Sequence, residues 1–212
     1  GTDGVVGTFA GREEGSTVRI NGVAFALSYQ GGSGGNDVTL TPLGDLVLTG
    51  SGDADAFELR SETAGGVDYI EYYVGGVRKG RWQSSDVYSI TIHGGGGNDS
   101  LLVNYAGSGG FFATDITFHG ESDSGAPGDR LTITGGTFVN VHHLFDNGQA
   151  GKIDLDETGD NVPDARLTYT GLEPVTQTGN LANLTLTLSS VNDAAVLEDN
   201  RDGSLNPTPT DG

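Results

Sequence analysis

The stretch that decides the fold is residues 90–103, which read ITIHGGGGNDSLLV. Alternating aliphatic residues on both sides of the glycines predict two short β-strands. The four consecutive glycines let the backbone adopt positive φ angles and bend sharply between those strands. Asp99 ends the corner, where its short carboxylate can accept hydrogen bonds from backbone N–H groups or bind a cation. We therefore expect a strand, a tight glycine corner and a second strand.

The same order of strand, glycine, aspartate and strand recurs along the chain. The corners span residues 31–37, 50–55, 94–99 and 120–129, and the second and third have equal length. A unit repeated in this way is typical of a solenoid, in which each coil buries the apolar side of the next. The sequence therefore predicts an all-β solenoid, with an antiparallel β-sandwich as the alternative.

The composition supports a thin core with many turns. The chain has 212 residues, of which 37 are glycine and 34% are hydrophobic. That length is enough for one elongated domain or two small ones. A thick globular core would need more apolar residues, whereas each coil of a solenoid buries only a few side chains.

Charge and cysteine content exclude several classes of function. The formal net charge is −19, and Lys and Arg together number 10, which argues against binding to nucleic acid or to an anionic membrane surface. An acidic surface suits divalent cations, but it also keeps a β-rich protein soluble. The chain has no Cys, so disulfides and thiolate metal sites are excluded. No apolar stretch has the length of a transmembrane helix.

Several short phrases carry a family resemblance. They are residues 7–11 (GTFAG), 14–15 (EG), 21–22 (NG), 28–29 (SY), 35–38 (GNDV) and 170–175 (TGLEPV). In these patches the chain resembles β-solenoid modules of very large secreted bacterial surface proteins, namely planctomycete and autotransporter-like adhesins. The resemblance implies a right-handed parallel β-helix, an extracellular or cell-surface location in a bacterium, and a role in adhesion or the cell envelope.

The chain divides into three predicted parts. Residues 1–43 form a hairpin and the first glycine corner, as the end of a preceding module; residues 44–188 form the β-helix body; residues 189–212 form an extended acidic tail or linker. The chain begins without a signal-like apolar stretch, and we expect it to be a processed or excised piece of a longer protein. The polar tail should be disordered alone, and our hypothesis is that a neighbouring chain or a preceding coil holds it.

A β-hairpin that protrudes from the body is predicted for residues 67–82, with its turn at Gly75-Gly76. Its candidate partner-binding residues are Tyr69, Tyr73, Arg78, Arg81 and the only tryptophan, Trp82. Aromatic and cationic side chains together can form a platform for a glycan or a partner subunit. In the alternative, the hairpin packs on the body and its cations pair with acidic side chains.

A calcium site is predicted at the corners. Residues 94–101 match GGxGxDxU, the pattern of the calcium-binding nonapeptides in RTX proteins, where glycine carbonyls and aspartate carboxylates of successive turns clasp the ion. The RTX site needs tandem copies nine residues apart, whereas here the copies are far apart. The sequence therefore leaves two alternatives, a corner that binds Ca²⁺ and a corner that is purely structural. The candidate metal-binding residues are Gly94, Gly96, Asn98 and Asp99 in this corner and Asp37, Asp55 and Asp129 in the others.

Two further metal sites are not expected. Residues 154–161 resemble an EF-hand loop but lack the flanking helices and a correctly placed terminal Glu. His142 and His143 are adjacent on a predicted strand and point to opposite faces, so they cannot chelate one zinc ion. His93 and His119 occupy equivalent positions of the repeat, which predicts imidazole rings that are stacked or packed at the corners.

These observations favour a structural role over catalysis. No GxSxG, HExxH or phosphate-binding loop is present. We expect an extracellular β-solenoid that serves as a subunit or segment of a surface fibre, stalk or adhesin and assembles end to end, with itself or other cell-surface components as partners. The alternative is a calcium-stabilised module that binds a glycan or a protein partner. A β-helix enzyme that degrades polysaccharides is the least favoured reading, because the acids lie at corners without clustered Arg or Lys.

Overall fold

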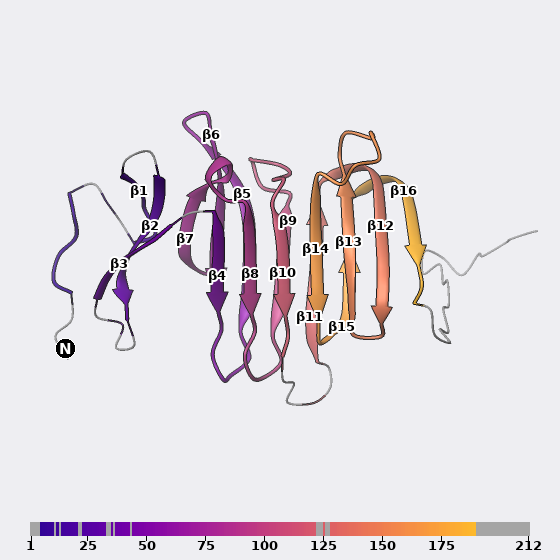
Figure 1. Ribbon diagram of the computed structural model, residues 1–212, viewed down its shortest axis with the longest axis horizontal. Coiled ribbons are helices and arrows are strands. Elements are labelled where there is room, and N and C mark those ends of the chain that lie inside the picture. Colours follow the sequence, from indigo (N-terminus) through magenta and orange to yellow (C-terminus); the bar gives the residue numbers. More distant parts are fainter. Residues whose placement is uncertain are drawn as a thin grey trace, which may run out of the picture.

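The protein consists of three β-sheets (Figure 1). The computed structural model describes residues 5–10, 12, 14–20, 23–32, 35, 37–42, 44–121, 125 and 128–189. Within this part the only helical element is a single 3₁₀ turn, η1 (Ser84–Asp86), and no helix is long and apolar enough to cross a membrane. The predicted all-β class is therefore confirmed.

Sheet A is a three-stranded antiparallel sheet at the N-terminal end, formed by β1 (Thr17–Ile20), β2 (Val23–Gly31) and β3 (Asp37–Pro42). The pairing of β1 with β2 confirms the predicted hairpin, although its two turn residues lie outside the described part. The prediction that residues 31–37 form a corner like the others was wrong, since Gly31 pairs directly with Asp37 across β2 and β3. Because β1 and β3 occupy both edges of β2, no edge is left for a parallel neighbour.

The other two sheets are larger and mixed. Sheet B contains, in order across the sheet, β16 (Asn180–Thr187), β12 (Thr137–Asn147), β13 (Ala150–Asp156), β14 (Ala165–Thr170), β10 (Asp115–His119), β8 (Ser89–His93) and β4 (Asp45–Thr49). Sheet C contains β15 (Leu172–Gln177), β11 (Asp129–Gly135), β9 (Ser100–Tyr105), β5 (Ala56–Ala64), β6 (Val67–Val74) and β7 (Val77–Gln83). Strands β6 and β13 are antiparallel to both of their neighbours, and all other pairings in the two sheets are parallel.

Four times the chain runs from a strand of sheet B through a corner into a strand of sheet C: from β4 to β5, β8 to β9, β10 to β11 and β14 to β15. Corresponding strands are parallel and in register, so that Leu46, Ile90, Ile116 and Leu167 form one row across sheet B. Parallel, in-register pairing of equivalent strands is what stacked repeats require. The first three of these corners are the predicted glycine corners at 50–55, 94–99 and 120–129.

The two larger sheets face each other and share one core. Along β8, Ile90 and Ile92 are buried and alternate with side chains that point outward, as expected for a strand with one face covered. Phe57 of β5 packs edge-on against Phe118 of β10, with ring centroids 6.2 Å apart, so the core joins both layers. The core is only these two layers of side chains thick, in keeping with the low apolar content.

The hairpin of β6 and β7 is confirmed, but it does not protrude as predicted. Strand β6 pairs with β5 from Phe57↔Val74 to Ala64↔Val67, so the hairpin continues sheet C in its own plane. The reason is the alternation of residues in β6, which places Ile70 on the same face as the core residues of β5 and buries it completely. The predicted strand near residues 181–188 is confirmed as β16.

Apolar side chains stay exposed at the two ends of the molecule. Sheet A lies at one end of the long axis and β16 at the other (Figure 1). On β16, Leu184 and Leu186 are 52% and 51% exposed, and they face the interior side of sheet B beyond the reach of sheet C. On sheet A, Val38 and Leu40 are also exposed.

Candidate functional site

Three features bear on function, and the first is a ladder of hydrogen bonds through the glycine corners. The N–H of Asp55 donates to Oδ1 of Asp99 at 2.7 Å, and the N–H of Asp99 donates to Oδ1 of Asp129 at 2.6 Å. Oδ2 of Asp55 accepts from the N–H of Ser51 at 2.6 Å within its own corner. Each corner is thus tied to the next through an aspartate, and the side chains of Asp99 and Asp129 are buried.

The glycines at the start of the corners make this ladder possible. The N–H groups of Gly50, Gly94 and Gly120 each donate to a carbonyl of the neighbouring strand at 2.7–2.9 Å. A Cβ on Gly94 would overlap the carboxylate of Asp99, and a Cβ on Gly120 would overlap that of Asp129. The ladder therefore needs glycine because the carboxylates lie directly against the Cα atoms.

The predicted calcium ligands occupy different places in this arrangement. The ladder brings together Asp55, Asp99 and Asp129, whereas Asp37 is exposed at the start of β3 in sheet A. The side-chain amide of Asn98 donates to the carbonyl of Gly125 at 2.9 Å. The N–H of Gly96 donates to the carbonyl of Ser51 at 3.1 Å, and Gly94 belongs to the ladder itself. Within the described residues, no group of three or more His, Asp or Glu side chains could hold a metal ion.

This geometry leads to a prediction about calcium. We expect the melting temperature, followed by circular dichroism, to change by less than about 2 °C when millimolar CaCl₂ is replaced by a chelator. The reason is that the described residues hold no group of three or more His, Asp or Glu side chains that could bind the ion, and one carboxylate oxygen of each corner aspartate already accepts a backbone N–H. A calcium-dependent rise of more than about 5 °C would instead support the site predicted from the sequence.

The second feature is a buried carboxylate on the outer face of sheet C. The side chain of Glu71 is fully buried and forms ion pairs with Arg60 at 3.1 Å, Arg78 at 2.7 Å and Arg81 at 3.5 Å. The hydroxyl of Tyr73 donates to Oε2 of Glu71 at 2.6 Å. Burial alone raises the pKa of Glu71, but the hydrogen bonds from Tyr73, Arg60 and Arg78 outweigh it and lower the pKa to about 2.

Two of these arginines also make cation–π contacts with tyrosine rings of the same hairpin. The guanidinium of Arg81 lies 3.9 Å from the ring centroid of Tyr69, and that of Arg60 lies 4.5 Å from that of Tyr73. Trp82 points the other way and is 5% exposed, within the core. Four of the five predicted partner-binding residues thus lie together, and Trp82 does not join them. The arrangement matches the alternative in which the cations of the hairpin pair with acidic side chains.

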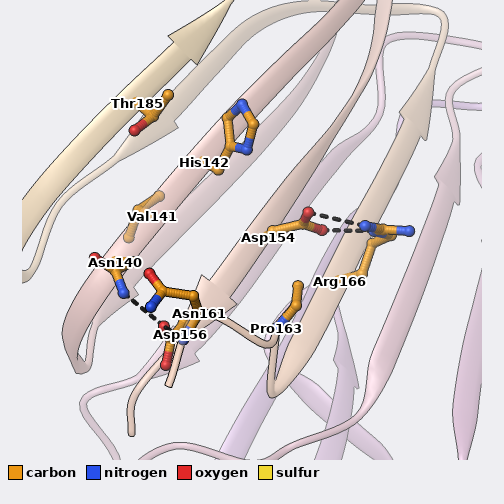
Figure 2. Close-up of a pocket in the computed structure, with 9 residues that line it drawn as sticks. All are labelled: Asn140, Val141, His142, Asp154, Asp156, Asn161, Pro163, Arg166 and Thr185. Atoms are coloured by element: carbon orange, nitrogen blue, oxygen red, sulfur yellow. Dashed lines mark hydrogen bonds and ion pairs between the residues drawn. The ribbon is translucent and has the colours of Figure 1, made fainter. Parts of the chain in front are cut away.

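The third feature is a pocket of about 380 Å³ on the outer face of sheet B (Figure 2). Its floor is formed by side chains of adjacent strands: His142 of β12, Asp154 of β13 and Arg166 of β14 lie in one row across the sheet. The loop after β13 forms a wall with Asn161, and Thr185 of β16 lies on the opposite side. The pocket therefore combines acidic, basic and neutral polar groups.

The carboxylates of this pocket are held by internal partners. Arg166 binds Asp154 through both Nε and Nη2, at 2.5 and 2.8 Å. Asp156 accepts hydrogen bonds from the side-chain amide of Asn140 at 2.6 Å and from the N–H groups of Gly159 and Asn161 at 2.5 and 3.1 Å. The hydrogen bond from Asn140, followed by those from the loop amides, lowers the pKa of Asp156. Both carboxylates are therefore held in fixed positions by partners within the chain.

The histidines behave as the sequence predicts. The rings of His93 and His119 are stacked, with centroids 5.0 Å apart. His142 points outward and its Nε2 lies 2.7 Å from the hydroxyl of Thr187, whereas His143 is buried and its Nε2 lies 2.7 Å from Oε1 of Gln177. The two adjacent histidines thus lie on opposite faces of β12.

Sequence reasoning missed the pocket and two members of the Glu71 cluster. Arg60 and Glu71 meet because β5 and β6 place them directly opposite each other, which only the register shows. For the pocket a signal was available: Asn147-Gly148 is a hairpin sequence of the same type as Asn21-Gly22. It predicts that β12 pairs with β13, but the turn lies at Gly148-Gln149, and the observed register, with its shift between Phe145 and Asn147, is what sets His142 opposite Asp154.

Comparison with known proteins does not assign the chain to a family: no family model matches it, and no curated protein or solved structure is significantly similar to it.

Proposed function

We propose that the chain is a structural segment of an extracellular fibre, stalk or adhesin, and that its copies associate end to end. In this proposal the four strand–corner–strand units are the coils of a short β-solenoid, and sheet A and β16 are its two contact surfaces. The resemblance to secreted bacterial surface modules agrees with such a role. The observation that carries the proposal is the exposed leucine row on β16.

The two ends offer complementary apolar surfaces. Leu184 and Leu186 extend the buried rows of sheet B past the last strand of sheet C, and the outer edge of β16 has no neighbouring strand among the described residues. By strand register, Val38 and Leu40 lie on the same face of sheet A as the buried Leu27. Covering these surfaces with a second copy removes apolar area from water and closes an open sheet edge.

The middle of the molecule supports a structural role over an enzymatic one. The aspartates of the corners bind backbone amides of the next corner, and the outer face of sheet C carries a carboxylate enclosed by arginines. A general acid needs a carboxyl group with a raised pKa, whereas the pKa values of Glu71 and Asp156 are both lowered. These acids stabilise the fold and are poorly suited to proton transfer.

The test is a double substitution on β16. We expect the wild-type protein to form concentration-dependent multimers in sedimentation velocity and rods in electron micrographs. Leu184→Lys with Leu186→Lys should weaken association at least about tenfold, because lysine charges would have to be buried at the contact. The melting temperature should hardly change, since both leucines are half exposed in the single copy.

The matched control is Thr185→Lys, which adds the same side chain to the opposite face of β16. It should associate as the wild type does. A wild-type protein that stays monomeric at every concentration, or a double variant that associates as strongly as the control, would contradict the proposal.

A further inference from the structure

The pocket on the outer face of sheet B shares strand β16 with the proposed association surface but lies on the opposite face of that strand from the leucine row. The side chains of His142, Asp154 and Arg166 that form its floor lie on the outer face of the sheet, whereas Leu184 and Leu186 of β16 point to the inner side of the same sheet. The strands that line the pocket, β12, β13, β14 and β16, lie toward the end of the long axis opposite sheet A (Figure 1). A ligand bound here would leave sheet A and the leucine row of β16 uncovered.

The charges of the pocket already neutralise each other or are stabilised by backbone donors. Asp154 shares a two-point ion pair with Arg166, and the side chain of Asp154 is only 13% exposed. Asp156 is enclosed by amide donors from Asn140 and from the loop. A cationic ligand therefore finds no open carboxylate pair, and an anionic ligand is opposed by the net charge of −19.

The groups that face the open volume are polar side chains that can both donate and accept hydrogen bonds. They are the side-chain amide of Asn161, the imidazole of His142 and the hydroxyl of Thr185, which come from three different sides of the pocket (Figure 2). Pro163 adds an apolar surface to the wall. Hydroxyl groups beside C–H surface match this mixture, and a volume of about 380 Å³ is within the usual range for small-ligand sites.

The positions of these groups are fixed before any ligand arrives. Asn161 has a φ of 66°, a left-handed conformation that its own N–H stabilises by donating to Asp156 at 3.1 Å. The ring of His142 is oriented by Thr187, and β16 is tied to β12 by the hydrogen bond from Asn183 to Asn140 at 3.0 Å. Preorganised groups lose little conformational entropy on binding.

We propose that this pocket binds a neutral saccharide residue of a glycan, with Asn161, His142 and Thr185 as the hydrogen-bonding residues. Both carboxylates act through their neighbours: Asp154 fixes Arg166 and Asp156 fixes the loop that carries Asn161. The pKa of Asp156 is lowered, and Asp154 is held by Arg166 in a two-point ion pair, so neither carboxylate is placed to donate a proton and the site binds its ligand without cleaving it.

The test uses the full chain labelled with ¹⁵N and titrated with four neutral hexasaccharides: maltohexaose, cellohexaose, mannohexaose and hexa-N-acetylchitohexaose. At least one of them should shift the amide signals of residues 140–142, 161 and 183–185 in a saturable way, with a Kd of about 1 mM or tighter. Hexagalacturonate, which has a similar ring size and a negative charge on each ring, should bind more weakly than that neutral sugar.

Two substitutions then locate the site. Asn161→Gly keeps the left-handed backbone and removes the amide side chain, and Thr185→Val keeps the shape and removes the hydroxyl. Together they should weaken binding about tenfold, which corresponds to two lost hydrogen bonds. Thr168→Val, on the same face of the sheet but outside the pocket, should leave the Kd unchanged.

Three results would overturn the assignment: no neutral hexasaccharide shifts these amides, the double variant binds as the wild type does, or hexagalacturonate binds most tightly. The melting temperature of the double variant shows whether its fold is intact. The multimers measured by sedimentation report separately on end-to-end association, so failure of one proposal is distinguishable from failure of the other.

Discussion

Glu71→Gln should lower the free energy of unfolding by about 3–5 kcal/mol, measured by urea denaturation with circular dichroism. The carboxylate of Glu71 is fully buried, and it is the shared partner of Arg60, Arg78 and Arg81. Glutamine has nearly the same shape, so packing is preserved. Three guanidinium groups would then lie close together around a neutral amide, which cannot offset their mutual repulsion.

The control for this substitution is Glu157→Gln, the same chemical change on an exposed side chain of the loop after β13. It should alter the free energy of unfolding by less than about 0.5 kcal/mol. If Glu71→Gln lowered the free energy of unfolding no more than the control does, the ion pairs of Glu71 with the arginines would not stabilise the fold.

The pH dependence gives an independent measure of the same group. The pKa of Glu71 is about 2 in the folded protein, compared with 4.5 for an unperturbed Glu. Because the folded-state pKa is lowered, the unfolded state binds the proton more readily, and stability falls as the pH drops from about 4.5 to about 2. The full shift corresponds to roughly 3 kcal/mol. Glu71→Gln should remove this part of the acid-induced loss, so the stability difference between wild type and variant should narrow over that range.

Local sequence was enough to predict the corners because their chemistry is local. A run of glycines followed by aspartate lets the chain bend, and the carboxylate binds nearby amides whatever the partner strand is. The direction in which the chain leaves each corner depends on strands that are distant in sequence. The segments 31–37 and 94–99 read alike, but the first closes an antiparallel hairpin and the second passes from one sheet to another. Both edges of β2 are taken by the strands next to it in sequence, whereas β8 and β9 pair with strands that are distant in sequence.

The candidate sites were harder to predict for the same reason. Alternation in β6 correctly placed Tyr69 and Tyr73 on one face, but the face of β7 that carries Trp82 depends on a register shift between β6 and β7. The pocket needs four adjacent strands, and the sequence order of these strands differs from their order in the sheet. Short-range patterns therefore predicted the strands and corners, whereas side chains from different strands could be combined only once the register was known.

Gly50→Ala should lower the free energy of unfolding by about 2–4 kcal/mol, measured by urea denaturation. A Cβ on Gly50 would overlap the carbonyl oxygen of Gly94 in the next corner and would crowd the ring of Phe57 and the carboxylate of Asp55. The carbonyl belongs to the backbone of the neighbouring corner, so it can move only if the two corners separate. That movement would weaken the hydrogen bond from the N–H of Gly50 to the carbonyl of His93.

The control is Gly52→Ala in the same corner, two residues further on. A Cβ there meets no atom within 4 Å, and Gly52 does not adopt a positive φ. Its stability should be unchanged or slightly higher than that of the wild type, since alanine restricts the unfolded chain more than glycine does. The two variants change the same residue type in the same loop, so a difference between them reports on the close approach of the corners alone. Equal urea midpoints for Gly50→Ala and Gly52→Ala would mean that the corners are not packed against each other in solution, and the ladder through Asp55, Asp99 and Asp129 would lose its structural basis.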